Sequence, residues 1–380
     1  MQIHVVRPGE SVWGIAHAYG VAHQDVIAAN DLPEPDRLVP GQALVVPTGG
    51  PQTPRQPAEA NAYVEPRGRE QDREVVAAVA QDLTYVTMFE YRVNRDGTID
   101  PLRDAQARAG ARAGGAAPIM ALTNIAEEQF SPELGEAVLA STDLQDRVLG
   151  NVLQLMRDRG FRGLNIDFEH LRPADREPYN QFLRRAAERM HAAGHTLSTA
   201  LAPKVSAEQT GAWYEAHDYP AHGQIADFSV LMTYEWGWSG GPPRAVAPLS
   251  EVERVIRYAV SAMPPRKIMM GMPLYGYDWT LPYVRGGPFA RVVSPQEATE
   301  LAARHSVTIR YDPDSQSPSF RYRDPHGREH EVWFEDARSV QAKFNLVKQH
   351  GLRGVSYWRL PISFPQNWLL LEANFEVRKL

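Results

Sequence analysis

The sequence predicts an α/β fold, a TIM (β/α)8 barrel, because eight short apolar runs alternate with amphipathic helices over most of its 380 residues. The runs are nearly continuous in hydrophobicity, as expected of parallel strands buried on both faces. A stretch rich in Pro, Arg, Tyr and Asp interrupts the alternation after the seventh run and predicts an α+β insertion over about 280–334. Insertions at that end of a barrel wall the active-site cleft. A doubly wound parallel sheet is the competing architecture.

The first 48 residues predict a separate small βααβ module. Ser11 is a suitable N-cap for its first helix, which Gly20 ends. The Pro- and Gly-rich stretch that follows predicts a linker over 49–60, so the barrel is expected to occupy 61–380. The four elements of the module are expected at Ile3–Val6, Val12–Tyr19, Gln24–Ala29 and Ala43–Val46.

The elements of the barrel follow in order along the chain. Its strands are expected at Ala62–Val64, Leu83–Phe89, Pro118–Thr123, Gly163–Phe168, Leu197–Leu201, Phe228–Thr233, Ile268–Pro273 and Gly354–Tyr357. The clearest helices, which show apolar residues at helical spacing, are expected at Asp143–Asp158, Ala174–Ala193, Leu249–Ala262 and Ala337–Gln349.

Composition excludes several classes of function. The absence of cysteine excludes disulfide scaffolds, thiolate metal sites and a cysteine nucleophile. The formal net charge of −6, without a basic stripe, gives no support for a nucleic-acid partner. No apolar run approaches the ~20 residues that span a bilayer, and the N-terminus lacks the pattern of a standard secretory signal. No metal or other cofactor is expected, because the histidines do not show the spacing of metal ligands and no Gly-rich phosphate loop opens a helix.

The strongest chemical signal is the fourth predicted strand, because Asn165, Asp167 and Glu169 alternate along it and therefore share one face. Three polar side chains facing a barrel interior require partners, and the last of them emerges where barrel enzymes keep their chemistry. Two carboxyls this close should not ionise equally, which suits a general acid beside an ionised stabiliser. The alternative is a strand end whose acids pair with nearby arginines.

The N-terminal segment resembles a LysM module, through the run from Val5 to Ala16, the run from Val26 to Asn30, and the run from Leu38 to Pro47. LysM modules bind glycans that contain N-acetylglucosamine, through the loop after the first strand and the loop after the second helix. The resemblance therefore implies glycan contacts at Gly9, Glu10, Ser11, Trp13, Asn30 and Leu32. A module that anchors a coat without affinity for sugar is the alternative.

The barrel segment resembles glycoside hydrolase family 18. Four ordered runs carry the resemblance: Gly163 to Glu169, Met232 to Glu235, Gly271 to Gly276 and Gly354 to Trp358. The family's usual fourth-strand signature has acids where this chain has Arg162 and Asn165, and its sixth-strand motif ends in Asp where this chain has Glu235.

This resemblance implies a retaining mechanism in which the substrate's own acetamide is the nucleophile. Glu169 would be the acid and later the base, and Asp167 would orient the acetamide and stabilise the cationic intermediate. Asn165 would hold Asp167 by a hydrogen bond, Tyr234 would donate to the acetamide oxygen, and Trp358 would form the floor under the sugar. Further substrate contacts are expected from Glu235, Trp236, Tyr275, Tyr277, Asp278 and Trp279, although core packing or an ion pair is the alternative for several of them.

More narrowly, the runs from Leu83 to Val93 and from Leu231 to Pro243 resemble the spore-germination branch of the family, which includes N-acetylglucosaminidases acting on spore cortex fragments. The expected partner is therefore an N-acetylglucosamine-containing glycan, peptidoglycan or chitin oligomers. The expected location is the spore coat or cortex surface of a spore-forming bacterium, with the protein cytoplasmic until release. The alternative hypotheses are a chitinase, a catalytically silent glycan-binding coat protein, and a transglycosylating or amidase-like barrel. Endo or exo action, the need for muramic δ-lactam and the oligomeric state are not predicted.

Overall fold

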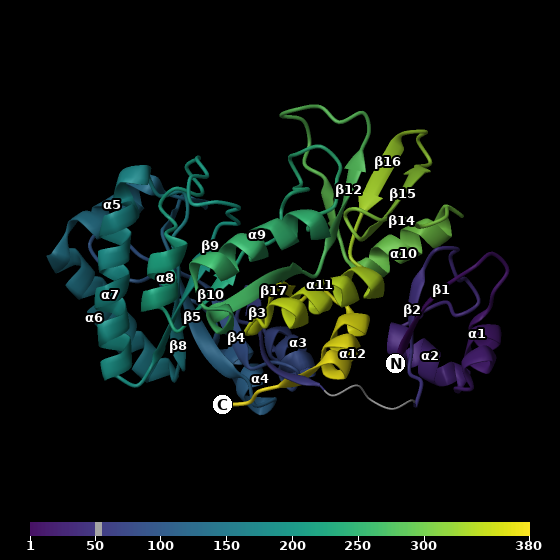
Figure 1. Ribbon diagram of the computed structural model, residues 1–380, viewed down its shortest axis with the longest axis horizontal. Helices are drawn as coiled ribbons and strands as arrows, with labels where there is room; N and C mark the ends of the chain where they lie inside the picture. Colours follow the sequence, from purple (N-terminus) through teal and green to yellow (C-terminus); the bar gives the residue numbers. More distant parts are fainter. Residues whose placement is uncertain (50–54) are drawn as a thin grey trace.

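The computed structural model describes residues 1–49 and 55–380 (Figure 1). The N-terminal βααβ module is present: β1 (Gln2–Val5) pairs antiparallel with β2 (Ala43–Val46), and two helices, α1 (Val12–Tyr19) and α2 (His23–Asn30), connect them. The hydroxyl of Ser11 accepts a hydrogen bond from Gly14 N at 3.1 Å and caps α1 as expected.

The predicted linker over 49–60 lies partly outside the described residues, which omit 50–54. Its last five residues differ from the expectation, because the first barrel strand, β3 (Gln56–Val64), already begins at Gln56. This early start has a physical reason. The last strand of the chain, β18 (Phe375–Val377), pairs in parallel with Gln56, Pro57 and Ala58 and extends the sheet below the barrel.

Eight parallel strands form a closed barrel, which confirms the predicted fold and excludes the open doubly wound sheet. The neighbours run from β3 round to the eighth strand, which pairs back with β3. All eight predicted strands are found, with bounds that differ by a few residues. After β3 they are β4 (Tyr85–Arg92), β5 (Ala117–Thr123), β8 (Gly163–Asp167), β9 (Thr196–Leu201), β10 (Phe228–Leu231), β11 (Ile268–Pro273) and β17 (Gly354–Leu360).

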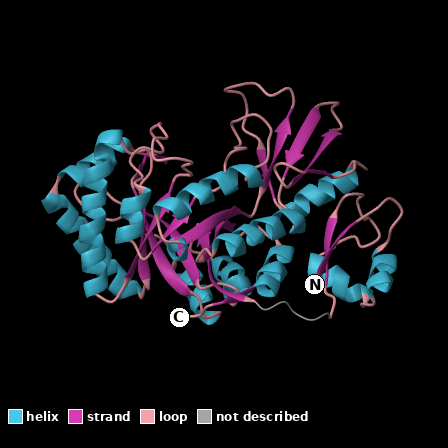
Figure 2. Cartoon of the chain, in the orientation of Figure 1, coloured by secondary structure: helices cyan, strands magenta, loops and turns pink. Residues whose placement is uncertain are grey.

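Helices cover the outside of the barrel (Figure 2). The four helices predicted from periodicity are found with nearly the expected bounds, and the first turn expected of α7 is instead a 3-10 turn at Pro173–Asp175. The helices are α3 (Glu70–Ala80), α4 (Ala105–Ala113), α5 (Pro132–Ala140), α6 (Thr142–Arg159), α7 (Arg176–Ala192), α8 (Tyr219–Ile225), α9 (Leu249–Ala262), α11 (Ala337–His350) and α12 (Pro365–Asn374). Among the described residues, no helix combines the length and apolar character needed to cross a membrane.

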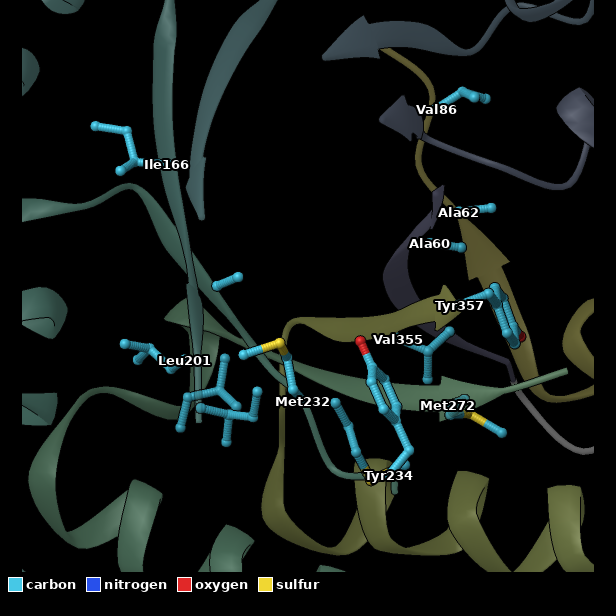
Figure 3. Packing of buried hydrophobic residues seen from close by; sticks show 14 of the residues in the cluster. Ala60, Ala62, Val86, Ile166, Leu201, Met232, Tyr234, Met272, Val355 and Tyr357 are labelled. Carbon is cyan, nitrogen blue, oxygen red and sulfur yellow. The ribbon is translucent and has the colours of Figure 1, made fainter. Parts of the chain in front are cut away.

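The main apolar core lies between the strands and these helices, and part of it reaches the barrel mouth. Figure 3 shows Tyr234 and Met232, which follow β10, among the buried side chains of this core. Two residues that line the site described below are thus held by the same packing that holds the barrel together.

The insertion after β11 is an antiparallel five-stranded sheet with one helix, α10 (Pro295–Arg304). It begins at Gly276, slightly before the predicted start. It has its own apolar core, which includes Val293, Phe320 and Val332. Its strands are β12 (Gly276–Thr280), β13 (Arg291–Val293), β14 (Arg310–Asp312), β15 (Ser317–Arg323) and β16 (Glu329–Trp333).

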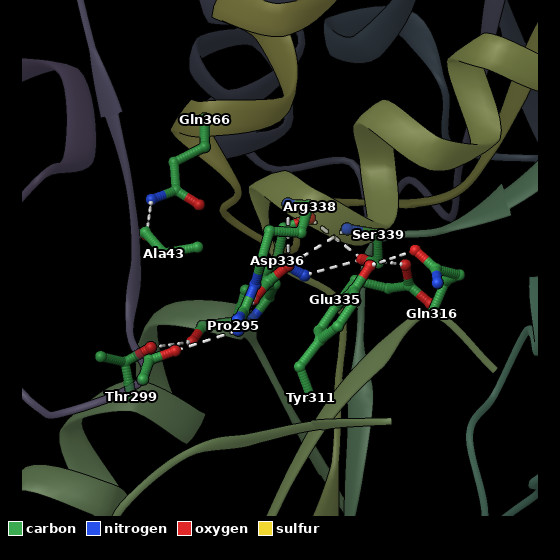
Figure 4. Close-up of polar contacts among 11 residues, drawn as sticks. Ala43, Pro295, Thr299, Tyr311, Gln316, Glu335, Asp336, Arg338, Ser339 and Gln366 are labelled. Carbon is green, nitrogen blue, oxygen red and sulfur yellow. Dashed lines mark hydrogen bonds and ion pairs between the residues drawn. The ribbon is translucent and has the colours of Figure 1, made fainter. Parts of the chain in front are cut away.

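The N-terminal module lies against the insertion, α11 and α12 (Figures 1 and 4). The amide nitrogen of Gln366 donates to the carbonyl of Ala43 at 2.9 Å and to Oδ1 of Asn30 at 2.7 Å. At Gly41, φ is 86° and a Cβ would stand 1.8 Å from the carbonyl oxygen of Ile309, so only glycine fits this approach. The module is therefore docked on the barrel and its insertion.

Candidate active site

A cavity of about 300 Å³ opens at the C-terminal ends of the barrel strands. Its wall is mostly aromatic and apolar, and three carboxyl side chains with two tyrosine hydroxyls provide polarity. This composition is typical of a site that binds a ligand with apolar faces and a few polar groups. The lining residues are Tyr63, Phe89, Ile125, Phe130, Asp167, Glu169, Ala200, Trp213, Met232, Tyr234, Glu235 and Trp358.

Asp167 is the last residue of β8 and Glu169 follows two residues later, so the strand delivers both acids to the cavity. Their exposed fractions are only 4% and 8%. The alternative of pairing with arginines is not seen for either acid among the described residues. Among residues 1–49 and 55–380, the one hydrogen bond to these carboxyls comes from the indole of Trp213 to Oε2 of Glu169, and Oδ1 of Asp167 is buried without a partner.

Burial controls the protonation of this pair. It raises the pKa of Glu169 to about 7, although the hydrogen bond from Trp213 opposes the shift. Burial, with the negative charges of Glu169 and Glu90, also raises the pKa of Asp167. The pKa of both carboxyls is therefore raised, whereas the sequence predicted a raised pKa for one of the two. A removable proton is nevertheless present near neutral pH, as general acid catalysis requires.

The backbone of Glu169 is fixed from two sides. Asn124, which follows β5, accepts a hydrogen bond from the Glu169 N–H and donates one to the Glu169 carbonyl, both at 2.9 Å. His217 donates from Nε2 to the carbonyl of Phe168 at 2.9 Å and accepts at Nδ1 from Ala202 N. Burial lowers the pKa of His217 to about 4, so this imidazole is neutral and can hold both bonds.

Asn165 differs from its expected role. Its amide nitrogen donates to the hydroxyl of Ser198 at 3.0 Å, and its oxygen accepts from the hydroxyl of Tyr63 at 3.0 Å. Within the described part of the chain it forms no hydrogen bond to Asp167. Asn165 instead ties β8 to β3 and β9 beneath the cavity.

The end of β10 contributes a second polar group to the cavity. The hydroxyls of Tyr275 and Tyr277 both donate to Oε1 of Glu235, the latter at 2.9 Å. Burial raises the pKa of Glu235, and these two bonds oppose the shift. Tyr234 is buried beside it and lines the cavity. The two tyrosines reach the site through Glu235 and not by lining it.

Trp358, at the end of β17, lies within an aromatic cluster. Its ring centroid is 5.0 Å from that of Phe89, edge to face, and 5.5 Å from that of Tyr63. It lines the cavity and is only partly buried. An indole that keeps one accessible face in such a cavity can stack on a sugar ring.

Besides Tyr275 and Tyr277, three further predicted contact residues lie outside the cavity lining. Trp236 packs against the main core. Asp278 is buried inside the insertion, where it accepts hydrogen bonds from Tyr322 and His330. Trp279 is buried and donates to the carbonyl of Gly241 at 2.9 Å. Asp278 and Trp279 lie outside the cavity because their side chains are buried against other partners, whereas Tyr277 of the same strand reaches Glu235.

The glycan-contact residues expected in the N-terminal module also divide into two groups. Asn30 is occupied structurally, since its side chain bonds Val26, Val45 and Gln366. Leu32 lines a cavity of about 220 Å³ at the junction with the insertion.

The first loop of the module remains open. Trp13 is 65% exposed and stacks on His17. Beside it, Gly9 has a φ of 81°, Glu10 accepts from His4 and from Arg7 N, and Ser11 caps α1.

Sequence reasoning missed Trp213, Asn124 and His217. Each lies in a loop after a strand, without a motif or period to mark it. Only the positions of Asn124 directly after β5 and of the other two between β9 and α8 could have drawn attention, because barrel enzymes place functional residues there.

Known proteins match this chain over its full length. The family model described as glycosyl hydrolases family 18 matches residues 124–361, and the LysM domain model matches residues 4–47. The cortical fragment-lytic enzyme of Bacillus subtilis (strain 168) is 44% identical over 427 aligned residues, covering 100% of this chain and 99% of the relative. The crystal structure of the spore cortex-lytic enzyme SleL from Bacillus megaterium QM B1551 superposes with a TM-score of 0.94 at 42% identity, covering 100% of this chain and 99% of the other. SleL from Bacillus cereus gives a TM-score of 0.96 at 40% identity, with coverage of 100% and 98%.

Proposed function

This chain belongs to the glycosyl hydrolases of family 18, and on that premise we propose that it cleaves the glycosidic bond after N-acetylglucosamine in fragments of spore cortex peptidoglycan. Full-length similarity to enzymes named for cortical fragment lysis supports this substrate. The LysM domain supports a polymer that contains N-acetylglucosamine. The observation that carries the proposal is the buried pair of Asp167 and Glu169 at the floor of an aromatic cavity at the barrel mouth.

Glu169 acts first as general acid. Its proton passes to the glycosidic oxygen as the bond from that oxygen to the anomeric carbon breaks. The acetamide oxygen of the same N-acetylglucosamine attacks the anomeric carbon and forms a cyclic oxazolinium intermediate. The raised pKa of Glu169 supports this role, because the carboxyl still holds its proton near neutral pH.

Asp167 and Tyr234 position the acetamide by hydrogen bonds. The hydroxyl of Tyr234 donates to the acetamide oxygen and aims it at the anomeric carbon. Asp167 accepts from the acetamide N–H, and the positive charge that develops on the ring favours its ionised form. Water then attacks the anomeric carbon as the bond from that carbon to the acetamide oxygen breaks. Glu169 accepts a proton from the water, the acetamide is restored, and the configuration is retained.

Trp358 and Glu235 hold the sugar during these steps. The accessible face of the Trp358 indole stacks on the pyranose ring, whose axial C–H groups are apolar. Glu235, oriented by two tyrosine hydroxyls, accepts from a sugar hydroxyl. This aromatic floor and polar wall fix which face of the ring meets Glu169.

The LysM domain keeps the enzyme on its polymer. Its exposed Trp13 offers a stacking surface outside the barrel cavity, so binding there raises the concentration of glycan at the active site. We place the protein at the coat or cortex surface of a spore, in line with the relatives named as spore cortex-lytic enzymes of Bacillus.

A product analysis tests the proposal. The protein and its Glu169→Gln variant are incubated with cortex fragments, vegetative peptidoglycan and chitin oligomers, and reduced products are identified by mass spectrometry. We expect new N-acetylglucosamine reducing ends from cortex fragments, and a loss of about 10²–10⁴-fold in the variant. Cleavage of chitin oligomers alone would assign a chitinase instead. Binding without any product would leave a glycan-binding coat protein.

A further inference from the structure

Trp213 bonds one of the two carboxyl oxygens of Glu169. The indole N–H donates to Oε2 of Glu169. The other oxygen, Oε1, forms no hydrogen bond to the described part of the chain, although Glu169 lines the cavity. One oxygen of the acid is therefore held by the protein, and the other is left to the ligand.

An indole nitrogen can donate a hydrogen bond but cannot accept one. The hydroxyl oxygen of a protonated carboxyl is a weaker acceptor than its carbonyl oxygen, so the bond from Trp213 is stronger when Oε2 is the carbonyl oxygen. The indole therefore favours the acidic proton on Oε1. We propose that Trp213 is a positioning residue that selects which oxygen of Glu169 carries the catalytic proton. This inference rests on the proposed role of Glu169 as general acid.

The surroundings of Trp213 keep its N–H on this target. Its ring stacks on that of His170 at 6.3 Å between centroids and 15° between planes, and it also contacts Tyr214. The segment between β9 and α8 that carries Trp213 is tied at both ends, because Nζ of the buried Lys204 donates to the carbonyl of His217 at 3.2 Å. The same His217 bonds the carbonyl that precedes Glu169.

A second reason supports the assignment. In the chemical cycle Glu169 must present the same oxygen twice, first to donate a proton and then to take one from water. A donor fixed on Oε2 keeps Oε1 facing the anomeric carbon throughout, without a rotation of the carboxyl between steps. Such fixed orientation is one of the ways in which an enzyme lowers its barrier.

The test compares Trp213→Phe with Tyr214→Phe, which removes a hydroxyl from the same segment without touching Glu169. Two probes are used, β-glycosides of N-acetylmuramyl-N-acetylglucosamine with methanol or 2,4-dinitrophenol as leaving group. Methanol needs the proton of Glu169 to depart, and dinitrophenolate does not. For Trp213→Phe we expect kcat to fall about 10- to 100-fold on the methyl glycoside and less than about 3-fold on the dinitrophenyl glycoside. Tyr214→Phe should resemble the wild type on both.

The pH profile gives an independent readout. The indole bond favours the ionised form of Glu169, so its loss should move the basic limb of kcat/KM for the methyl glycoside upward by about 0.5–1 pH unit. Equal loss on both glycosides with an unmoved profile would reduce Trp213 to a packing residue and overturn the inference. Thermal unfolding of each variant separates misfolding from this outcome. Failure of the wild type and of Glu169→Gln to differ on either glycoside would instead overturn the proposed function.

Discussion

The side chain of Asn124 accepts a hydrogen bond from the N–H of Glu169 and donates one to the carbonyl of Glu169, each at 2.9 Å. Asn124 is fully buried and also donates to the carbonyl of Ser131. The two bonds therefore hold the backbone of Glu169 in one orientation. Its position is set by a side chain from the strand beside it in the barrel.

Asn124→Ala should lower both activity and stability. Two backbone groups of Glu169 would lose their partners in a buried place, so we expect the free energy of unfolding to fall by about 1–3 kcal/mol. Misplacement of the acid should lower kcat by about 10-fold or more. Urea denaturation and initial rates on cortex fragments measure the two effects. Asn345→Ala, on the exposed face of α11, is the matched control and should change neither.

The stability of the protein should depend on the charge of Glu169. Its pKa is about 7 when folded against an ordinary value of 4.5, so the folded state binds more protons between these pH values. Stability contributed by the protonated form is therefore lost as pH rises from about 4.5 to about 7. Glu169→Gln removes this slope and should be more stable than the wild type at pH 8, by about 1–3 kcal/mol.

The measurement is chemical denaturation of both proteins at pH 4.5 and pH 8. Glu188→Gln, an exposed change on α7, serves as the control for loss of one acid. Equal differences between Glu169→Gln and wild type at the two pH values would contradict the raised pKa.

Glu235 should act as a hydrogen-bond acceptor in substrate binding. Glu235→Ala removes the acceptor of two tyrosine hydroxyls and of the sugar, so we expect KM to rise about 10-fold, with kcat changed less. Tyr277→Phe leaves the bond from Tyr275 in place and should have a smaller effect. Steady-state kinetics on soluble fragments decide the matter. A fall in kcat with constant KM would place Glu235 in the chemical step instead.

Trp13 should contribute to binding of the polymer and not to cleavage of the glycosidic bond. Trp13→Ala removes the exposed indole, and we expect binding to insoluble peptidoglycan to weaken about 10-fold. Turnover of soluble disaccharide glycosides should stay unchanged, because the barrel cavity is untouched. Sedimentation measures binding to insoluble peptidoglycan, and steady-state kinetics measure turnover of the soluble glycosides. Val5→Ala, an exposed change in the same module, should leave both at the wild-type level.

The barrel and its acids could be predicted from sequence because their signals are local. Buried parallel strands are apolar along their length, and alternation on β8 places Asp167 and Glu169 on one face. The partners of these acids could not be found in this way. Three loop residues provide these partners, Trp213, Asn124 and His217. Their contacts with Glu169 and its backbone depend on how each loop folds over the C-terminal end of the barrel.

A related cause places some of the predicted contact residues outside the cavity lining. Asp278 follows the seventh strand closely, but closeness in sequence does not tell which side of a new sheet a residue occupies. The side chain of Asp278 meets Tyr322 of β15 and His330 of β16, inside the insertion. Asn165 likewise has different partners from those expected, because Tyr63 of β3 and Ser198 of the neighbouring β9 bond its amide.

The docking of the N-terminal module has a consequence for how the chain unfolds. Gln366 of α12 is bonded to Asn30 and Ala43, and Gly41 lies directly against Ile309. Opening this junction would remove polar partners from both sides at once, so we expect the module and the barrel to unfold in one cooperative transition. The change in composition near residue 48 would then not separate two independently unfolding units. On heating, the glycan anchor would be lost together with the catalytic barrel and not before it.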